Sequence, residues 1–135
     1  MKVSIVSTHH FSAAHRLHNP DRDAGWNREV FDKCNNAHGH GHTYGLEVEV
    51  EGEVDFETGY VLDFKELRAV VEEAVLRKVE RRHLNFDVPF LEGINPTAEN
   101  IAIALWRELS PRIPRGRLKR LVLHETEKNS VVYEG

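Results

Sequence analysis

The sequence predicts an α+β fold in which a four-stranded antiparallel sheet carries two helices on one face. Apolar and polar residues alternate near the start of the chain, at Val3 and Ile5, and again from 43 to 51, as they do in half-buried strands. Two segments with helical spacing follow, and two short apolar segments close the chain. Helices grouped between hairpin-connected strands are typical of α+β proteins.

The segment from 43 to 51 has the clearest strand pattern. Its apolar side is formed by Tyr44, Leu46, Val48 and Val50. A turn signal between Asp55 and Gly59 precedes the apolar residues 60–62, so we expect this strand to fold back as a hairpin.

The two helices are expected in the middle of the chain. The first begins at Asp63, which with Glu66 resembles a capping box, and runs to about Arg81. The second begins at Pro96 and Thr97 and ends before Pro111. The apolar residues that recur at helical spacing are Phe64, Leu67, Val70, Val71, Ala74 and Val75 in the first helix, and Ile101, Ala104, Leu105 and Leu109 in the second.

The last two strands are predicted around 121–123 and 131–133, with a turn at 127–129. The expected order is therefore β-β-α-α-β-β, without an internal repeat or linker, and we expect residues 1–135 to form one domain. An antiparallel sheet with two open edges and an uncovered face favours oligomerisation.

Composition argues against several classes of partner. The 18 basic and 22 acidic residues are interspersed and give a formal net charge of −4, so we expect no nucleic-acid binding. No apolar run approaches the roughly 20 residues that cross a bilayer, and the N-terminus lacks a signal-peptide core. The single cysteine, Cys34, fits a reducing compartment, so we expect a cytoplasmic protein that does not bind membranes.

Histidine is unusually frequent, with nine in 135 residues. His40 and His42 directly precede the best strand, and an extended backbone points both imidazoles to the same side. His15 ends an alternating segment with Phe11 and Ala13 that can pair beside them. Catalytic zinc sites usually have three protein ligands and one open position, so the sequence predicts such a site here. The alternative is that the His-x-His pair arises by chance in a histidine-rich loop.

The motifs around these histidines extend into a longer pattern. With Phe11-Ser-Ala-Ala-His15-Arg-Leu and then Cys34-Asn-Asn-Ala-His-Gly-His40-Gly-His42, the sequence resembles the 6-pyruvoyl-tetrahydropterin synthase and 6-carboxytetrahydropterin synthase family. The resemblance covers essentially the whole chain. Further matching segments, in the family's order, are Thr58-Gly-Tyr-Val-Leu-Asp63-Phe, His83-Leu-Asn, Asp87-Val-Pro, Pro96-Thr-Ala-Glu-Asn100, His124-Glu-Thr and Val131-Val-Tyr.

The resemblance implies a tunnelling fold, in which the sheets of several subunits join into an oligomeric barrel, usually a hexamer. It implies Zn²⁺ held by His15, His40 and His42, and conversion of the small molecule 7,8-dihydroneopterin triphosphate to a 6-carboxy or 6-pyruvoyl tetrahydropterin with release of triphosphate. The pathway would be bacterial pterin or queuosine biosynthesis. The six-residue spacing from Cys34 to His40 resembles the pyruvoyl-forming branch. Alternatives are a dihydropterin side-chain aldolase and a non-catalytic zinc- and pterin-binding paralogue.

Matched residue by residue, Cys34 falls on the family's catalytic cysteine and Glu125 on the carboxylate that anchors the pterin. A carboxylate suits this role because it can accept two parallel hydrogen bonds from the guanidine-like edge of the ring. Thr97 and Glu99 match positions near the pterin, although they have an equally good explanation as residues that begin a helix. The alternative role for Cys34 is that of a small buried apolar residue.

The sequence departs from the family at Glu80 and Arg81, which stand where the family has an Asp-His pair contributed across the subunit interface. Arginine stays protonated and cannot shuttle a proton as imidazole does. Arg81 could instead act electrostatically, on the cysteine or on the triphosphate. His83 or His38 could otherwise supply the missing imidazole.

Overall fold

The computed structural model describes all residues from 1 to 135 and contains a five-stranded sheet in the order β3-β1-β2-β4-β5. The strands are β1 (Lys2–His15), β2 (His40–Glu53), β3 (Arg82–His83), β4 (Arg117–His124) and β5 (Ser130–Tyr133). Neighbours are antiparallel except β1 and β3, which are parallel. The predicted four-stranded antiparallel sheet is wrong in this respect, because a two-residue strand is too short to show alternation.

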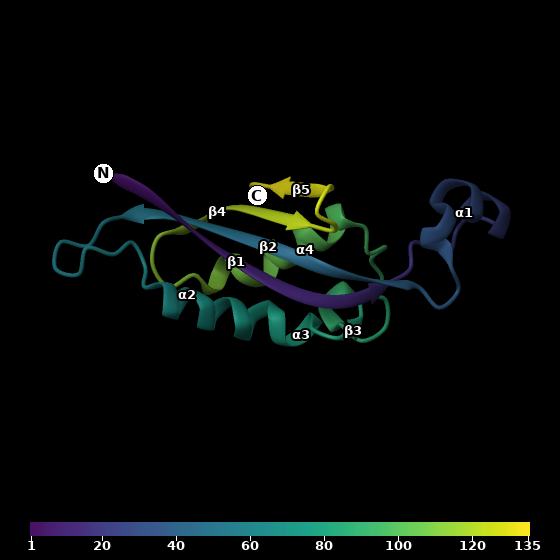
Figure 1. Ribbon diagram of the computed structural model, residues 1–135, viewed down its shortest axis with the longest axis horizontal. Coiled ribbons are helices and arrows are strands. Elements are labelled where there is room, and N and C mark those ends of the chain that lie inside the picture. The colour runs from purple at the N-terminus through teal and green to yellow at the C-terminus, as the bar shows by residue number, and fades with distance from the viewer.

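The strands β1 and β2 pair over 14 residues each, from Lys2 opposite Glu53 to His15 opposite His40, and run as two long curved ribbons through the molecule (Figure 1). Every second residue of β1 is buried from Ser7 to His15. In β2 the side of His40 and His42 is half-buried, and the same side becomes fully buried from Tyr44 to Val50. The predicted pairing of the His15 segment beside the His40 segment is confirmed.

The first predicted helix is a continuous helical run made of α2 (Phe64–Val71), a π-helical segment (Glu72–Leu76) and α3 (Arg77–Val79). Asp63 caps it as predicted, accepting a hydrogen bond from the Lys65 N–H at 2.7 Å. It ends at Val79 rather than Arg81, because Glu80 leaves the helical conformation with a ψ of 124° and Arg81 follows with a φ of 58°. The second helix, α4 (Ala98–Leu109), is capped by Thr97 as predicted.

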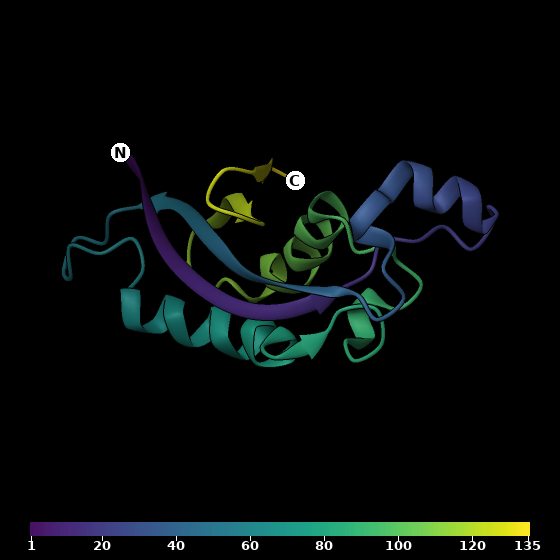
Figure 2. The same ribbon diagram turned by 45° about the vertical axis from the view of Figure 1, so that its right-hand side comes forward.

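Both helices cover the same face of the sheet, as predicted, with α2 and α3 below β1 and α4 next to β4 and β5 (Figure 2). One cluster of buried residues joins them to the sheet, for example Leu67 and Val71 from α2, Leu105 from α4, and Leu46 and Val48 from β2. The other face of the sheet has no helix. None of the helices combines the length and the hydrophobicity that crossing a lipid bilayer requires.

A third helix, α1 (Ala24–Phe31), was not predicted and lies beyond the end of β1 and β2 (Figure 1). Asp23 caps it by accepting from the Trp26 N–H at 2.7 Å. Its only buried residue is polar: the Asn27 amide donates to the carbonyls of Asn19, Arg22 and Asp23. Because this helix has no buried apolar stripe, its sequence lacks the periodicity that marks the other two.

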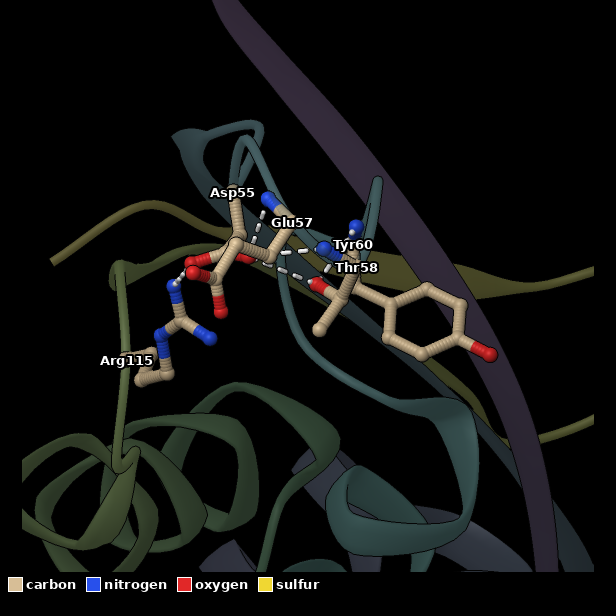
Figure 3. A network of polar contacts seen from close by, with 5 residues as sticks. All are labelled: Asp55, Glu57, Thr58, Tyr60 and Arg115. Carbon is tan, nitrogen blue, oxygen red and sulfur yellow. Dashed lines mark hydrogen bonds and ion pairs between the residues drawn. The ribbon is translucent and has the colours of Figure 1, made fainter.

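The predicted hairpin after β2 is also wrong, because residues 60–62 form no strand. The Asp55 carboxylate accepts hydrogen bonds from the N–H groups of Glu57 and Thr58 and from the Thr58 hydroxyl, and it pairs with Arg115 at 3.1 Å (Figure 3). These contacts close a compact side-chain turn. The chain then continues into α2, with Val61 and Leu62 buried in the core.

Candidate metal centre and active site

The three candidate ligands meet where β1 ends and β2 begins. Strand register places His15 opposite His40, and His42 follows two residues later on the same buried side as Tyr44. One ligand atom from each histidine lies within 4.8 Å of the others, and the Nε2 atoms of His15 and His40 are 3.2 Å apart. Two nitrogens that share a tetrahedral zinc ion, at bond lengths of about 2.0–2.1 Å, lie about 3.3 Å apart.

Hydrogen bonds around the triad also suit a metal. His15 Nδ1 lies 2.8 Å from the Pro96 carbonyl, which can only accept, so Nδ1 carries the hydrogen and the Nε2 lone pair is free. Metal-binding histidines are commonly oriented by such a second bond. His42 Nε2 and His40 Nδ1 are buried without a hydrogen-bond partner, which is costly unless another group satisfies them. The residues therefore fit a zinc ion.

The charge state of the triad favours binding as well. Burial is the main cause that lowers the pKa of His15, and the neighbouring imidazoles of His40 and His42 lower it further. Burial likewise lowers the pKa of His40, followed by the effect of His42. Both rings are thus neutral at neutral pH, the form that coordinates metals.

Cys34 lies on a 3₁₀ turn, Asp32–Asn35, between α1 and β2. Its carbonyl accepts a hydrogen bond from the Leu17 N–H at 2.8 Å, which ties this turn to the segment after His15. Burial first, then the carboxylates of Glu125 and Asp32, raise the pKa of the thiol, although its side chain is partly exposed. Within this chain the thiol therefore stays protonated at neutral pH, and the charged groups that act on it are both carboxylates.

The three candidate pterin-binding residues, Thr97, Glu99 and Glu125, line one cavity of about 400 Å³ together with Leu17. Glu125 lies at the β4–β5 turn, where its N–H donates to the Asn129 carbonyl at 3.0 Å. Glu125 also lines a cavity together with His42. Leu17, which lines the cavity of Thr97 and Glu99, donates its N–H to the Cys34 carbonyl. The structure thus brings these candidates together.

Glu80 and Arg81 lie instead at the outer edge of β1. The Arg81 N–H donates to the Ser12 carbonyl at 2.6 Å, and Glu80 accepts weakly from the Ser12 N–H at 3.4 Å. The Arg81 side chain is 90% exposed and 3.9 Å from the Glu80 carboxylate. These two side chains face solvent rather than the cavity that Glu125 lines.

His83 is the candidate imidazole that lies against the metal-binding segment. A Cβ atom on Gly39 would come within 2.9 Å of His83 Nε2, so the ring packs directly on the backbone that leads to His40. His83 and His42 line a second cavity of about 630 Å³ together with Arg81. His38 is exposed.

Two contributors to the site were not anticipated. Tyr44, fully buried, places its hydroxyl 3.4 Å from His15 Nδ1, and the Pro96 carbonyl orients the same ring. Tyr44 was predicted only as a core residue. Its position two residues after His42 on the same strand was the signal that could have placed it beside the triad. The Pro96 contact uses a backbone carbonyl, which every residue has, so no sequence signal could have identified it.

A family model described as 6-pyruvoyl tetrahydropterin synthase matches residues 4–135. The chain belongs to the 6-pyruvoyl tetrahydropterin synthase family. It is 39% identical over 125 residues to the human 6-pyruvoyl tetrahydrobiopterin synthase, a match that covers 93% of this chain and 86% of the human protein. It is 40% identical over 126 residues to the Drosophila melanogaster protein of that name, covering 93% and 75% of the two chains.

Solved structures agree with this membership. The 6-pyruvoyl tetrahydropterin synthase of Caenorhabditis elegans superposes with a TM-score of 0.94 at 37% identity, over 100% of this chain and 96% of that one. The Plasmodium vivax enzyme, at 13% identity, has a TM-score of 0.71 over 100% and 98% of the chains and shows the shared fold alone. The family's α+β architecture is therefore common to all three chains.

Proposed function

We propose that this chain converts 7,8-dihydroneopterin triphosphate to a 6-substituted tetrahydropterin and releases triphosphate, using zinc held by His15, His40 and His42. The observation that carries the proposal is the convergence of the histidine triad, the Cys34 turn and the Glu125 cavity at one end of the sheet. Relatives named for the 6-pyruvoyl product favour that product over the 6-carboxy form.

In this proposal Glu125 binds the pterin ring in the cavity of about 400 Å³. Its carboxylate accepts two parallel hydrogen bonds from the ring amino group and the adjacent N–H, a strong arrangement because the acceptor is charged. Thr97 uses its hydroxyl to cap α4, accepting from the Asn100 N–H at 3.1 Å, so its contribution is to fix the cavity wall. Glu99, in the first turn of α4, completes that wall.

Zinc held by three neutral imidazoles would supply Lewis acidity toward the oxygens of the substrate side chain. Cys34 then holds or moves the proton of the adjacent carbon at its Sγ atom. A thiol whose pKa is raised by burial and by Glu125 is a poor base until a positive charge or a second base assists it. A partner for Cys34 is therefore required.

We assign that role to His83, with Arg81 acting electrostatically. His83 Nδ1 accepts a hydrogen bond from the Asn85 N–H at 3.3 Å, so Nε2 carries the hydrogen of the neutral ring and faces the Gly39 segment, where it would act as a donor to the thiolate. We propose a barrel-shaped hexamer as the assembly, in which the exposed Arg81 and its partner Glu80 act on a second subunit. The open length of β1 beside the two-residue β3 offers an edge for that assembly.

The test is to incubate purified, zinc-loaded protein with 7,8-dihydroneopterin triphosphate, measure triphosphate release, and identify the pterin by mass spectrometry. Release with a 6-pyruvoyl product supports the proposal, and a 6-carboxy product transfers it to the other branch. A shortened side chain without triphosphate release would indicate an aldolase. Tight pterin binding without conversion, unchanged in the Cys34→Ala variant, would indicate a binding protein.

A further inference from the structure

A cavity of about 470 Å³ lies between the segment that follows His15 and the connection from α1 to Cys34. Its lining includes three cationic side chains, those of Arg16, Arg28 and Lys33, and one carboxylate, that of Asp32. This concentration of positive charge stands out in a chain whose formal net charge is −4. A pocket of this kind attracts anions.

The three cations have no carboxylate partner within 4.0 Å in the structure. Arg16 Nε donates to the Asn35 carbonyl at 3.1 Å, which uses one of its five N–H donors. Cations on the open face of the sheet are different: Arg117 and Lys119, for example, pair with Glu51 at 3.1 and 3.0 Å. The cavity therefore holds uncompensated charge that an anion would neutralise.

His18 adds a neutral donor to this lining. The buried Asn35 amide donates to the Leu17 carbonyl at 2.7 Å and to His18 Nδ1 at 2.9 Å. Because the carbonyl fixes the amide orientation, His18 Nδ1 must accept, and the hydrogen of the neutral ring is on Nε2. The backbone of Arg16 is held in turn by Asn85, through two hydrogen bonds of 2.8 Å. The lining is thus ordered by amide side chains.

We propose that this cavity binds an oligophosphate: the triphosphate group of the substrate and, after its release, inorganic triphosphate. Guanidinium groups suit this ligand because their planar N–H donors match phosphate oxygens. The cavity also lies next to the reacting groups. Lys33 and Asn35, which line it, flank Cys34, while Leu17, between Arg16 and His18, lines the cavity of Glu125. The identity of the phosphate chain rests on the proposed function, whereas the binding of an anion does not.

Calorimetric titration with inorganic tripolyphosphate tests the anion site on the full, zinc-loaded protein. We expect the double variant Arg28→Gln, Lys33→Gln to bind at least about tenfold more weakly, because two charge-assisted contacts are lost. Asp32→Asn should bind more tightly, since it removes the one repelling carboxylate from the lining. The matched control is Arg22→Gln, a cation just before α1 that stacks on the Trp26 ring at 4.7 Å instead of lining the cavity.

Arg22→Gln should change the affinity for tripolyphosphate less than about twofold. Tripolyphosphate can also chelate zinc, but this effect is common to all variants. An equal loss in Arg22→Gln and in the double variant would mean non-specific attraction and would overturn the site. Unchanged affinity in the double variant would overturn it as well.

Steady-state kinetics separates this inference from the proposed function. In the double variant the KM for 7,8-dihydroneopterin triphosphate should rise about tenfold or more, while the affinity for dihydroneopterin without phosphate stays unchanged. If the protein converts the substrate and the double variant leaves KM unchanged, the subsite assignment is wrong and the function stands. If no substrate is converted but tripolyphosphate binds as predicted, the anion site stands and the proposed function is wrong.

Discussion

The Nε2 atoms of His15 and His40 lie 3.2 Å apart because the last residue of β1 is paired with the first residue of β2. A slip of one residue between these strands would turn one ring to the opposite face of the sheet. The candidate metal centre therefore depends on strand register, which the buried alternation along both strands sets. Its geometry is a consequence of how the sheet packs on its helices.

The triad leads to the first prediction. His42→Ala removes a ligand whose Nε2 is buried without a partner, so purified protein should fall from about one zinc per chain to a small fraction of that. Elemental analysis after dialysis measures the content. His38→Ala, which removes an exposed histidine from the same segment, should retain its zinc. Full zinc content in the His42 variant would contradict the ligand assignment.

The second prediction concerns Gly39 and uses Gly59 as a matched control, since both have a φ of 77°. An alanine at either position pays the left-handed backbone cost of about 1–2 kcal/mol. At Gly39 the new Cβ would also lie 2.6 Å from the His15 carbonyl oxygen and 2.9 Å from His83 Nε2, whereas at Gly59 nothing lies within 4 Å.

Urea denaturation of the metal-free proteins should therefore show Gly39→Ala losing about 2 kcal/mol more than Gly59→Ala. Zinc affinity should fall only in the Gly39 variant, because the new Cβ atom pushes the His15 carbonyl, and with it the His15 backbone, out of position. Equal losses in the two variants would show that the close contact has no energetic effect.

The third prediction separates two effects of Glu125. Glu125→Gln should weaken pterin binding by about 10- to 100-fold, since a charged acceptor is replaced by a neutral amide. It should also lower the pKa of Cys34, because the Glu125 carboxylate raises it. Asp32→Asn should lower the thiol pKa in the same way and leave dihydroneopterin binding unchanged. Calorimetry with dihydroneopterin measures pterin binding, and the pH dependence of iodoacetamide alkylation measures the thiol pKa. An unchanged alkylation profile in both variants would contradict the electrostatic effect of the two carboxylates on Cys34.

The parts of this site that could be predicted are those that repeat along the chain. Alternation from Tyr44 to Val50 identified β2, and shared parity extended it back to His40 and His42. The segment ending at His15 was matched to it by the same argument, and the register confirms that pairing. The alternation of apolar residues predicts which face of the sheet each side chain lies on, and only side chains on the same face can form one site.

The parts that could not be predicted depend on contacts that carry no period. Helix α1 is organised by the buried amide of Asn27, and β3 is only two residues long. The expected hairpin at 60–62 fails because the Asp55 side chain closes a turn instead. The place of Arg81 follows from two non-helical residues, Glu80 with a ψ of 124° and Arg81 with a φ of 58°, which no helical pattern reveals.

The fourth prediction tests which residue assists Cys34. If His83 moves the proton, His83→Asn should lower kcat by about 100-fold or more, the usual contribution of a general acid or base, and should keep its zinc. Arg81→Gln should have a smaller effect on kcat, since arginine stays protonated in this range and cannot itself move the proton.

Arg81→His in the His83→Asn background supplies the matching rescue experiment. Recovery of turnover would show that an imidazole at position 81 can serve the thiol, as in the family pattern. Equal kcat in wild type and His83→Asn would remove His83 from the mechanism.

The last prediction concerns a buried histidine outside the site. His9 is 2% exposed, shares a hydrogen bond of 2.7 Å with the Ser7 hydroxyl, and has no partner for Nδ1. Burial, followed by the charge of Arg68 and of His10, lowers the pKa of His9 from 6.5 to about 4. The unfolded chain therefore binds a proton at a higher pH than the folded chain does. The stability contributed by neutral His9 is complete above pH 6.5 and is lost as the pH falls toward 4.

Between about pH 7.5 and about pH 5 this loss amounts to about 2 kcal/mol of unfolding free energy. The double variant Ser7→Ala, His9→Leu removes both polar groups, so its stability should decline by about 2 kcal/mol less than that of wild type over this interval. Ser7→Ala alone should be less stable than wild type at both pH values and keep the full pH dependence, because it leaves the His9 ring buried. Urea denaturation of the metal-free proteins at the two pH values measures this change in unfolding free energy. The contribution of the other histidines is the same in wild type and variants, so it cancels when the changes are compared. If the double variant shows the wild-type pH dependence, His9 is not the group that titrates.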